Sequence, residues 1–374
     1  MVPKRKSCHL AIITLFCVAF LLLPLTSTAN FTVSGRIVNT DDGEAITNAA
    51  VFLNNSLISA ATNSAGTFIL NGVKSGQYDL IVALKGYKTY QQTITVTGAT
   101  SLPDIDISLN GITINDEGQE PNTDFAVNYK IFKRFLFGQS IYSDQCKILN
   151  PGILKFQYDS VTLILTAKAD KLLTIENLAL GYRIKFLLTN FSYYLKSDTP
   201  ELADYIFFEE MDGSPAQKAK WQTNRLNIYE GSAMNFFCAL AGYRTRQVGF
   251  RVFRVAENVT ASGKNKNSKA QTVKFKSVRS LELRDMVKQT AIKGRFALIF
   301  RDSLYVAFRK DHDKEITNPL QNRFTTMISL ISPYAYFDNN GIIINPDGIA
   351  FKGYWKEYPL PELLPFDFEP ASRK

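Results

Sequence analysis

The strongest constraint on the fold is the stretch TNSAGTFILNGVKSGQYDLIVALKGYKTYQQTITV, residues 62–96. Apolar and polar side chains alternate in short runs, and glycines separate the runs. Alternation with a period of two puts the apolar side chains of a strand on one face, and glycine permits the tight turns that reverse the chain. The stretch therefore predicts antiparallel strands joined by turns, each with one face to bury.

The same pattern extends over residues 31–109. Short apolar-rich runs recur, and polar turn residues such as those at 39–43 and 63–66 separate them. About seven strands in about eighty residues can bury their apolar faces only against a second sheet. We therefore expect a seven-stranded β-sandwich over residues 30–110.

Two segments of this region carry a resemblance to a known family. They are SGRIVNTDDGEAITNAAVFLNN (34–55) and TNSAGTFILNGVKSGQYDLIVALKGYKTY (62–90). Together they resemble the carboxypeptidase regulatory-like, or transthyretin-like, β-sandwich, an appendage of zinc carboxypeptidases. The matching positions are turn glycines such as Gly66 and core aromatics such as Phe68, so the resemblance implies a fold and no activity.

The first residues, MVPKRKSCHLAIITLFCVAFLLLPLTSTAN, have the features of an export signal. A basic start at 4–6 precedes an apolar core at 10–23, and small residues follow up to Ala29. This order is typical of a secretory signal peptide, and the apolar core is shorter than the ~20 residues of a spanning helix. We expect residues 1–29 to be removed and the protein to be exported, to the periplasm or to the outer membrane as a peripheral protein.

The remaining chain predicts a mainly β protein in two parts. A polar stretch at 111–124 reads as a linker, and 125–374 as a larger β-rich α+β region with a possible internal boundary at 257–271. This region contains one clear amphipathic helix, at about 215–241. Ser214 and Pro215 are suited to its start, Gly242 to a left-handed end, and a mostly apolar stripe that includes Arg225 runs along it. A second, short helix is expected near LELRDMV, 281–287.

The order of motifs beyond residue 125 carries a second resemblance. CKILNPGILKFQYD, KAKWQTNRLNIYEGSAMNFF, VGFRVFRV and NPDGIAFKGYWKEYPLPELLPFDF follow one another as in secreted Gram-negative proteins named only for their carboxypeptidase-like regulatory domain. That family implies export and no reaction. This chain departs from the pattern, with Asn235 in place of a histidine, Cys238 in place of an arginine, and Arg244 and Arg246 in place of acids. A polar site around the helix would therefore be altered here.

Zinc peptidase chemistry fails on ligand count. Such a site needs two histidines and a glutamate, with a further glutamate as general base. After the signal peptide the chain has one histidine, His312, which stands three residues before Glu315 in a fully charged stretch. A solvated turn explains that stretch better than a metal site, and Asp338-Asn339-Asn340-Gly341 starts like a calcium loop without the closing acid. We expect no metal and no cofactor.

Paired carboxylates are the remaining route to catalysis. The region 201–230 holds Glu209, Glu210, Asp212 and Glu230, which could host acid–base hydrolysis if two carboxyls met across a cleft. The context YIFFEEMDGSP favours a strand that ends in a charged turn before a helix, where negative charge is stabilising without any catalytic role. A carboxylate-dependent hydrolase is therefore the alternative interpretation, and no residue is assigned as catalytic.

Cysteines and aromatic pairs leave alternatives open. Cys146 and Cys238 are the cysteines beyond the signal peptide, and either a disulfide or two buried free thiols fits them. The pairs Tyr193-Tyr194 and Tyr354-Trp355 suit stacking on sugars or peptides, although core packing accounts for most aromatics in β proteins.

The sequence thus favours a non-catalytic, exported binding or scaffold protein of the cell envelope. Its expected partner is an envelope protein or glycan, engaged through sheet edges and loops. Of the formal net charge of +9, three units belong to the signal peptide, and an exported protein does not meet nucleic acid, so we expect no nucleic-acid partner. Basic clusters at 244–254 and 264–269 offer attraction to anionic lipid or polysaccharide, but a solvated strand face and loop explain them as well.

Overall fold

The computed structural model describes residues 30–96, 104–112, 124–260, 271–311, 315–357 and 359–370. The expected signal peptide at 1–29, linker residues 113–123, loop residues 261–270 and His312 lie outside these ranges. Within the described ranges, no helix has the length and apolarity that a membrane crossing requires.

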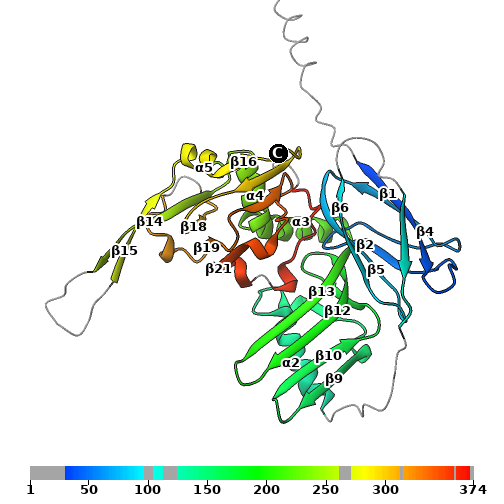
Figure 1. Ribbon diagram of the computed structural model, residues 1–374. Helices are drawn as coiled ribbons and strands as arrows, with labels where there is room; N and C mark the ends of the chain where they lie inside the picture. Colours follow the sequence, from blue (N-terminus) through cyan, green and yellow to red (C-terminus); the bar gives the residue numbers. More distant parts are fainter. Residues whose placement is uncertain are drawn as a thin grey trace, which may run out of the picture.

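The N-terminal part is the expected seven-stranded sandwich (Figure 1). One sheet has the order β4-β1-β7 and the other β3-β2-β5-β6. Apolar side chains from both sheets, such as Val33 and Leu80, form one buried cluster between them. The strands are β1 (Phe31–Asn39), β2 (Ala50–Leu53), β3 (Ser59–Ala61), β4 (Thr67–Val73), β5 (Gly76–Ala83), β6 (Tyr90–Val96) and β7 (Ile105–Leu109).

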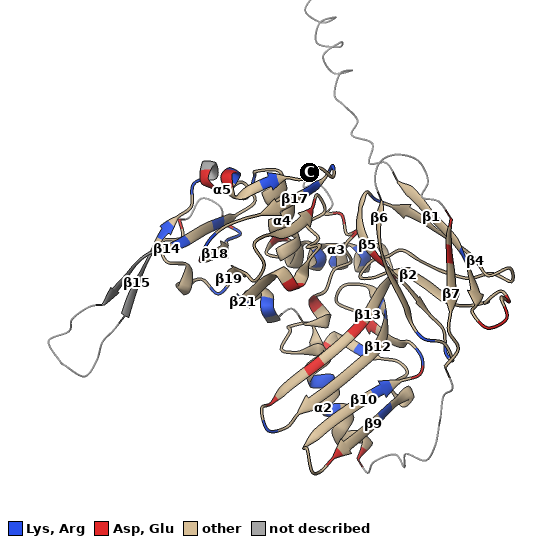
Figure 2. Ribbon diagram, viewed as in Figure 1, with Lys and Arg blue, Asp and Glu red and all other residues tan. Residues whose placement is uncertain are grey.

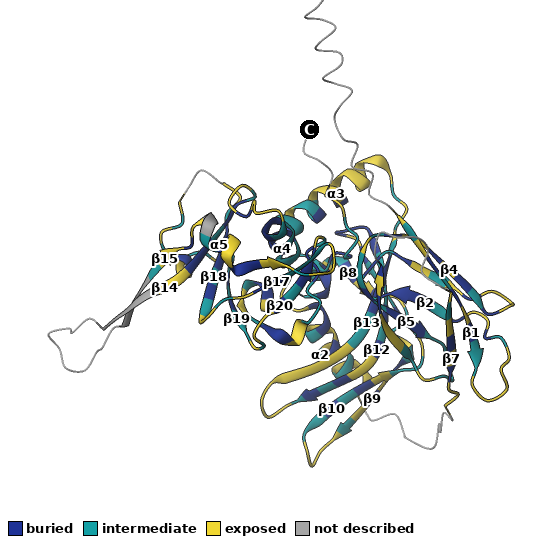
Figure 3. Cartoon of the chain, turned by 45° about the horizontal axis from the view of Figure 1, so that its top comes forward, coloured by how far each residue is buried: buried dark blue, intermediate teal, exposed yellow. Residues whose placement is uncertain are grey.

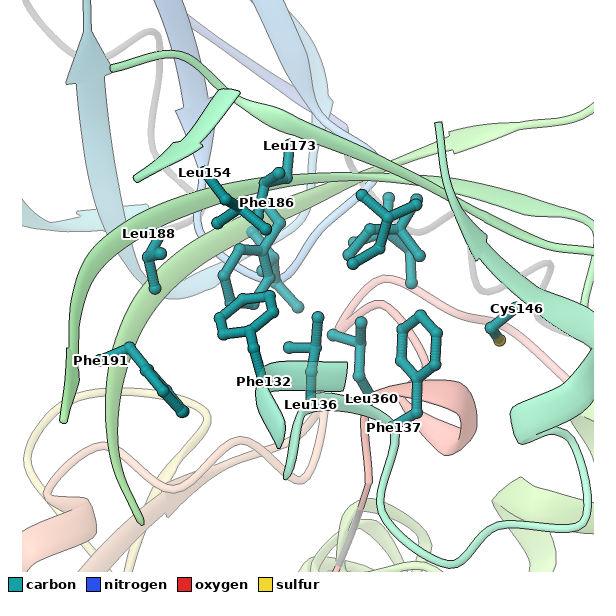
Figure 4. Packing of buried hydrophobic residues seen from close by; sticks show 14 of the residues in the cluster. Phe132, Leu136, Phe137, Cys146, Leu154, Leu173, Phe186, Leu188, Phe191 and Leu360 are labelled. Carbon is teal, nitrogen blue, oxygen red and sulfur yellow. The ribbon is translucent and has the colours of Figure 1, made fainter. Parts of the chain in front are cut away.

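A six-stranded sheet, β8-β11-β12-β10-β9 with β13 on β12, follows in the chain. The helix α2 (Phe125–Phe137), which the sequence interpretation did not foresee, covers one face. Figure 4 shows Phe132 and Leu136 of α2 pointing toward Phe186 and Leu188 of the sheet. The strands are β8 (Cys146–Ile148), β9 (Leu154–Asp159), β10 (Ile164–Ala169), β11 (Leu173–Asn177), β12 (Tyr182–Tyr194) and β13 (Thr199–Glu210).

The other face of this sheet packs on the sandwich. Phe207 of β13 meets Phe52 of β2 with ring centroids 4.6 Å apart. Backbone hydrogen bonds reinforce the contact, since Asn55 N–H donates to Ile206 C=O at 2.7 Å and Phe208 N–H to Ser56 C=O at 2.8 Å. The sandwich and the six-stranded sheet are therefore joined by packing and by strand-like bonding.

The single helix expected at 215–241 is wrong, because the structure has two: α3 (Pro215–Glu230) and α4 (Ala233–Ala241). The start is as expected, with Ser214 Oγ accepting from Gln217 N–H at 3.4 Å. Ser232 causes the break: its backbone is extended, and its Oγ accepts from Asn235 N–H at 3.1 Å as the cap of a new helix. A serine side chain competes in this way with the helical backbone.

The expected left-handed Gly242 is also wrong. Gly242 is the C-cap of α4 with φ −88°, and Tyr243 is the residue with positive φ, at 53°. Tyr243 N–H donates to Leu240 C=O, and Arg244 N–H to Ala239 C=O. This is the Schellman pattern, in which the left-handed residue is the one after the C-cap.

The last part holds a five-stranded sheet, β15-β14-β18-β19-β21, and a three-stranded sheet, β16-β17-β20, with α4 between them in one apolar cluster. The helix α5 (Ser280–Met286) confirms the short helix expected near 281–287. Figure 1 shows β14 and β15 extending beyond the other strands as a ribbon. The strands are β14 (Phe250–Thr260), β15 (Gln271–Ser277), β16 (Val287–Gln289), β17 (Arg295–Leu298), β18 (Ser303–Phe308), β19 (Thr325–Leu330), β20 (Ala335–Asp338) and β21 (Ile349–Gly353).

Short 3-10 turns connect several of these strands. They are η1 (Ser143–Gln145), η2 (Pro151–Ile153), η3 (Pro319–Gln321), η4 (Pro346–Gly348), η5 (Tyr354–Glu357) and η6 (Leu360–Glu362). The described part of the chain is thus mainly β, with one sandwich, three further sheets and four α-helices.

Candidate functional site

Glu210, one of the four acids of 201–230 that the sequence analysis names, is held by a buried arginine. Arg225 of α3 forms two bonds to the Glu210 carboxylate, Nη1 to Oε1 at 2.7 Å and Nη2 to Oε2 at 3.1 Å. The same guanidinium donates to Leu180 C=O at 2.6 Å and Gly181 C=O at 3.2 Å, and lies over the Tyr182 ring at 3.7 Å. Arg225 therefore fastens α3 both to the β11–β12 turn and, through Glu210, to the end of β13.

The other acids of this region have different partners. Glu209, on the opposite face of β13, lies 3.9 Å from Arg183 and 3.8 Å from Lys185. Glu230 is 3.2 Å from Lys310 of the loop after β18. Each of these three glutamates thus has its own cationic partner.

A second polar group lies where the sandwich meets β20; we call it the seam, formed by Lys74, Tyr78, Cys238, Asp338 and Asp367. Asp338 Oδ1 accepts from Asn340 N–H at 2.9 Å and Ile342 N–H at 3.0 Å. The stretch that begins like a calcium loop is therefore an Asx turn that uses its carboxylate internally. No group of three or more metal-ligating side chains occurs in the described ranges.

The seam locks the β4–β5 turn of the sandwich to the end of the chain. Asn340 Nδ2 donates to Ser75 C=O at 3.1 Å, and Lys74 Nζ pairs with Glu369 at 2.6 Å. Asp367 accepts from Leu57 N–H at 3.0 Å. Burial, and the nearby Asp338 and Asp367, raise the pKa of Tyr78 above its ordinary range, so its hydroxyl stays protonated.

The two cysteines are free thiols in the structure, which corresponds to the second of the alternatives left open by the sequence. Cys146 lies in the core under α2, where burial raises its pKa to about 12. Cys238 donates to Asn339 C=O at 3.4 Å, and burial raises its pKa to about 11. Thiols with such pKa values are protonated at neutral pH and are poor nucleophiles.

The seam predicts a pH-dependent stability. Burial raises the pKa of Asp338 from 3.8 to about 6, although hydrogen bonds from backbone N–H groups act to lower it. The titratable groups Tyr78 and Cys238 lie near the Asp338 carboxylate. Because the folded pKa lies above the unfolded one, the stabilisation by protonated Asp338 is complete below about pH 4 and is lost as the pH rises through about 6.

Asp338→Asn is therefore expected to flatten the profile, and the difference between the free energies of unfolding at about pH 5 and about pH 7 should shrink by about 1 kcal/mol. Urea titrations at both pH values measure it. Asp347→Asn is the matched control, because Asp347 is an exposed carboxylate nearby in the sequence. Equal profiles for Asp338→Asn and the wild type would contradict the assignment.

A hollow among the described residues lies elsewhere, at the end of the five-stranded sheet. We call this cavity of about 410 Å³ the groove; it is lined by Phe308, Arg309, Lys310, Glu315, Ile316, Thr317, Asn318, Gln321, Asn322, Arg323 and Phe324. Its lining carries three cations and one carboxylate. Figure 2 shows further Lys and Arg residues along the neighbouring β14, which include Arg251 and Arg254.

The sequence interpretation did not single out the groove, although a signal for it exists. Arg309-Lys310 and Arg323 flank a segment without the alternation of a strand. Such a connection between two strands lies beside the ends of both strands. Of the aromatic pairs that were singled out, Tyr193 and Trp355 are buried, so neither pair presents two open rings.

The sandwich defines the class of the N-terminal part, and a comparison with family models gives its family. Residues 33–116 match the model described as CarboxypepD_reg-like domain. The N-terminal part is therefore a carboxypeptidase regulatory-like domain, which confirms the resemblance read from residues 34–55 and 62–90. A comparison with curated proteins finds no significant match to the chain.

Solved structures show remote similarities. A DUF3823 family protein from Bacteroides ovatus is 14% identical over 47% of this chain and 80% of its own, at a TM-score of 0.18. The major pilin subunit BcpA of Bacillus cereus is 11% identical over 48% and 69%, at 0.19. A putative membrane-associated protein of unknown function from Bacteroides fragilis is 9% identical over 87% and 95%, at 0.18. At such TM-scores these similarities carry no argument about this chain.

Proposed function

We propose that this protein is a non-catalytic binding or scaffold protein exported to the cell envelope, in the periplasm or on the outer membrane as a peripheral protein. The observation that carries the proposal is the groove, where the described lining residues combine three cations and several amides with one carboxylate, Glu315. Hydrolysis by paired carboxylates needs a second acid across the site, whereas recognition of a ligand needs only complementary charge and hydrogen bonds.

Ion pairs made by acidic residues of 201–230 support the same proposal. Glu210 is engaged by Arg225, and Glu230 by Lys310 at the rim of the groove. Both carboxylates therefore neutralise cations that belong to the protein itself. Lys310 also donates to Asn227 at 3.0 Å, which ties the groove to α3.

The build of the molecule suits a scaffold. The carboxypeptidase regulatory-like domain is held to the rest through Phe52–Phe207, the strand-like bonds of Asn55 and Ser56, and the seam. Such a body presents loops and sheet edges at fixed positions. Figure 3 also shows an exposed helix surface, the first half of α3, whose residues from Pro215 to Lys220 are exposed. The partner we propose is an envelope protein or glycan.

The proposed localisation in the cell envelope rests on residues 1–29 and on the resemblance to secreted Gram-negative proteins. The test is affinity capture from the envelope fraction with the chain that begins at Asn30, followed by mass spectrometry of the retained proteins and glycans. The proposal expects a reproducible partner that is recovered at its full mass. No reproducible partner, or partners recovered only as fragments, would contradict it.

A further inference from the structure

We propose that the groove binds an anionic oligosaccharide of the uronic-acid type, with Arg309 and Arg323 contacting its carboxylates. The inference deepens the proposed function and rests on it, because it names the class of ligand.

Two guanidinium groups of the lining have no carboxylate partner among the described residues. Arg309 Nη1 donates to the backbone carbonyl of Glu315 at 3.2 Å. The remaining N–H groups of this guanidinium have no hydrogen-bond acceptor among the described residues. Arg323 lies over the Phe324 ring at 4.4 Å, a contact that leaves its N–H groups open. Lys310, in contrast, is engaged by Glu230 and Asn227. An arginine fork matches a carboxylate in two parallel hydrogen bonds.

The amides of the groove divide into structural and available ones. Asn322 uses both ends of its amide, donating to Phe308 C=O at 3.0 Å and accepting from Phe324 N–H at 2.8 Å, so it shapes the wall. Asn318 uses only its oxygen, which accepts from Leu320 N–H at 3.0 Å. The exposed Gln321 makes no side-chain hydrogen bond within the described ranges. The Asn318 nitrogen and the Gln321 amide are thus available to sugar hydroxyls.

The strands beside the groove argue against an extended acidic peptide. One common way for an extended peptide to bind is by adding to a free strand edge. β18 is paired with β14 on one side and β19 on the other, and β19 is also paired with β21. Even the strand ends are engaged, since Phe308 N–H donates to Phe324 C=O and Arg309 N–H to Gly249 C=O. Recognition here falls to side chains, as ring hydroxyls and ring carboxylates require.

The size of the groove fits this class of ligand. A volume of about 410 Å³ is within the range of small-ligand sites and accommodates one or two sugar rings rather than a long chain. Phe308, which is buried, and Phe324, which lies under the Arg323 guanidinium, form the apolar part of the lining.

The experiment is isothermal titration of the chain from Asn30 with a short oligogalacturonate, its neutral methyl ester and an oligoglutamate of similar charge. We expect saturable binding of the oligogalacturonate that weakens between about 50 mM and about 300 mM salt, because the contact is ionic. Arg309→Gln and Arg323→Gln should each reduce the association constant about tenfold or more. Arg36→Gln, an exposed arginine of β1, should leave it unchanged.

Other outcomes overturn the inference. Equal binding of the methyl ester, or binding unaffected by both variants, would remove the charged groove as the site. Equal binding of the oligoglutamate with the same dependence on Arg309 and Arg323 would make the ligand an acidic peptide. No binding of any probe, with a reproducible partner in envelope capture, would end this inference and leave the proposed function standing. Cleavage of the oligogalacturonate would instead contradict the proposed function.

Discussion

Replacing Arg225 by Met is expected to lower the free energy of unfolding by about 3 kcal/mol. The buried guanidinium donates to Leu180 C=O and Gly181 C=O, and methionine of similar length cannot replace these bonds. The buried Leu180 C=O then lacks a donor, and Gly181 C=O keeps only the bond from Met211 N–H at 3.0 Å. Most of the cost comes from these carbonyls, because Glu210 is about half exposed and regains water when its partner is lost.

Urea unfolding followed by circular dichroism measures this loss. Lys220→Met is the matched control, because Lys220 is exposed on the same helix and its replacement should change the free energy of unfolding by less than about 0.5 kcal/mol. If Arg225→Met lost no more than Lys220→Met, the attachment of α3 to the β11–β12 turn would need another explanation. Trp221 and Asn224, which donate to Leu178 C=O and Ala179 C=O, would be the next candidates.

The second large effect is expected for Gly341→Ala. Gly341 has φ +78°, and a Cβ at this position would lie 2.1 Å from Met234 C=O and 3.1 Å from Cys238 N, both in α4. The left-handed backbone costs about 1 kcal/mol for alanine, and the displacement of α4 adds about 1–3 kcal/mol. The expected total is about 3 kcal/mol.

Gly72→Ala separates the two contributions. Gly72 has the same φ of +78°, but its Cβ would meet nothing within 4 Å. It should therefore lose about 1 kcal/mol, from backbone strain alone. Thermal and urea unfolding of both variants give the comparison. Equal losses for Gly341→Ala and Gly72→Ala would show that the approach of α4 to the Asp338–Ile342 turn is looser than the structure has it.

The sandwich could be predicted because its determinants are local. Each strand shows its own alternation, and each turn carries its own residues. Asn63 Oδ1, for example, accepts from Ala65 N–H and Thr67 N–H, two and four residues further along the same turn. Gly66 has φ +74°, and a Cβ there would lie 2.5 Å from Ile37 C=O. Requirements of this kind are written in neighbouring residues and can be read without knowledge of the rest.

The break between α3 and α4 was missed because two signals compete at one place. The apolar spacing continues through Gly231 and Ser232, and it predicts one helix. The structure needs the break for distant contacts: Trp355 Nε1 donates to Gly231 C=O at 2.8 Å, and the Phe308 ring lies 3.2 Å from where a Gly231 Cβ would be. These partners lie far along the chain, and no local pattern announces them.

The polar contacts between distant segments could not be predicted from the sequence for the same reason. Arg225 appears in the sequence as an interruption of an apolar stripe, and only the structure supplies its acceptors. The seam joins residues near 75, 340 and 367, and the groove joins the end of β18 to the start of β19. In each case a residue type was visible, but its partner depended on how the sheets pack.

The central claim is that this protein binds envelope material without changing it. The most direct test incubates the chain from Asn30 with isolated envelope glycans and proteins, and compares the masses of retained and unretained species with those in an untreated sample. Our account predicts that the retained species have unchanged masses, and that Arg309→Gln combined with Arg323→Gln reduces their retention. New fragments of lower mass that require Glu209, Glu210 or Glu230 would contradict it and favour the hydrolase.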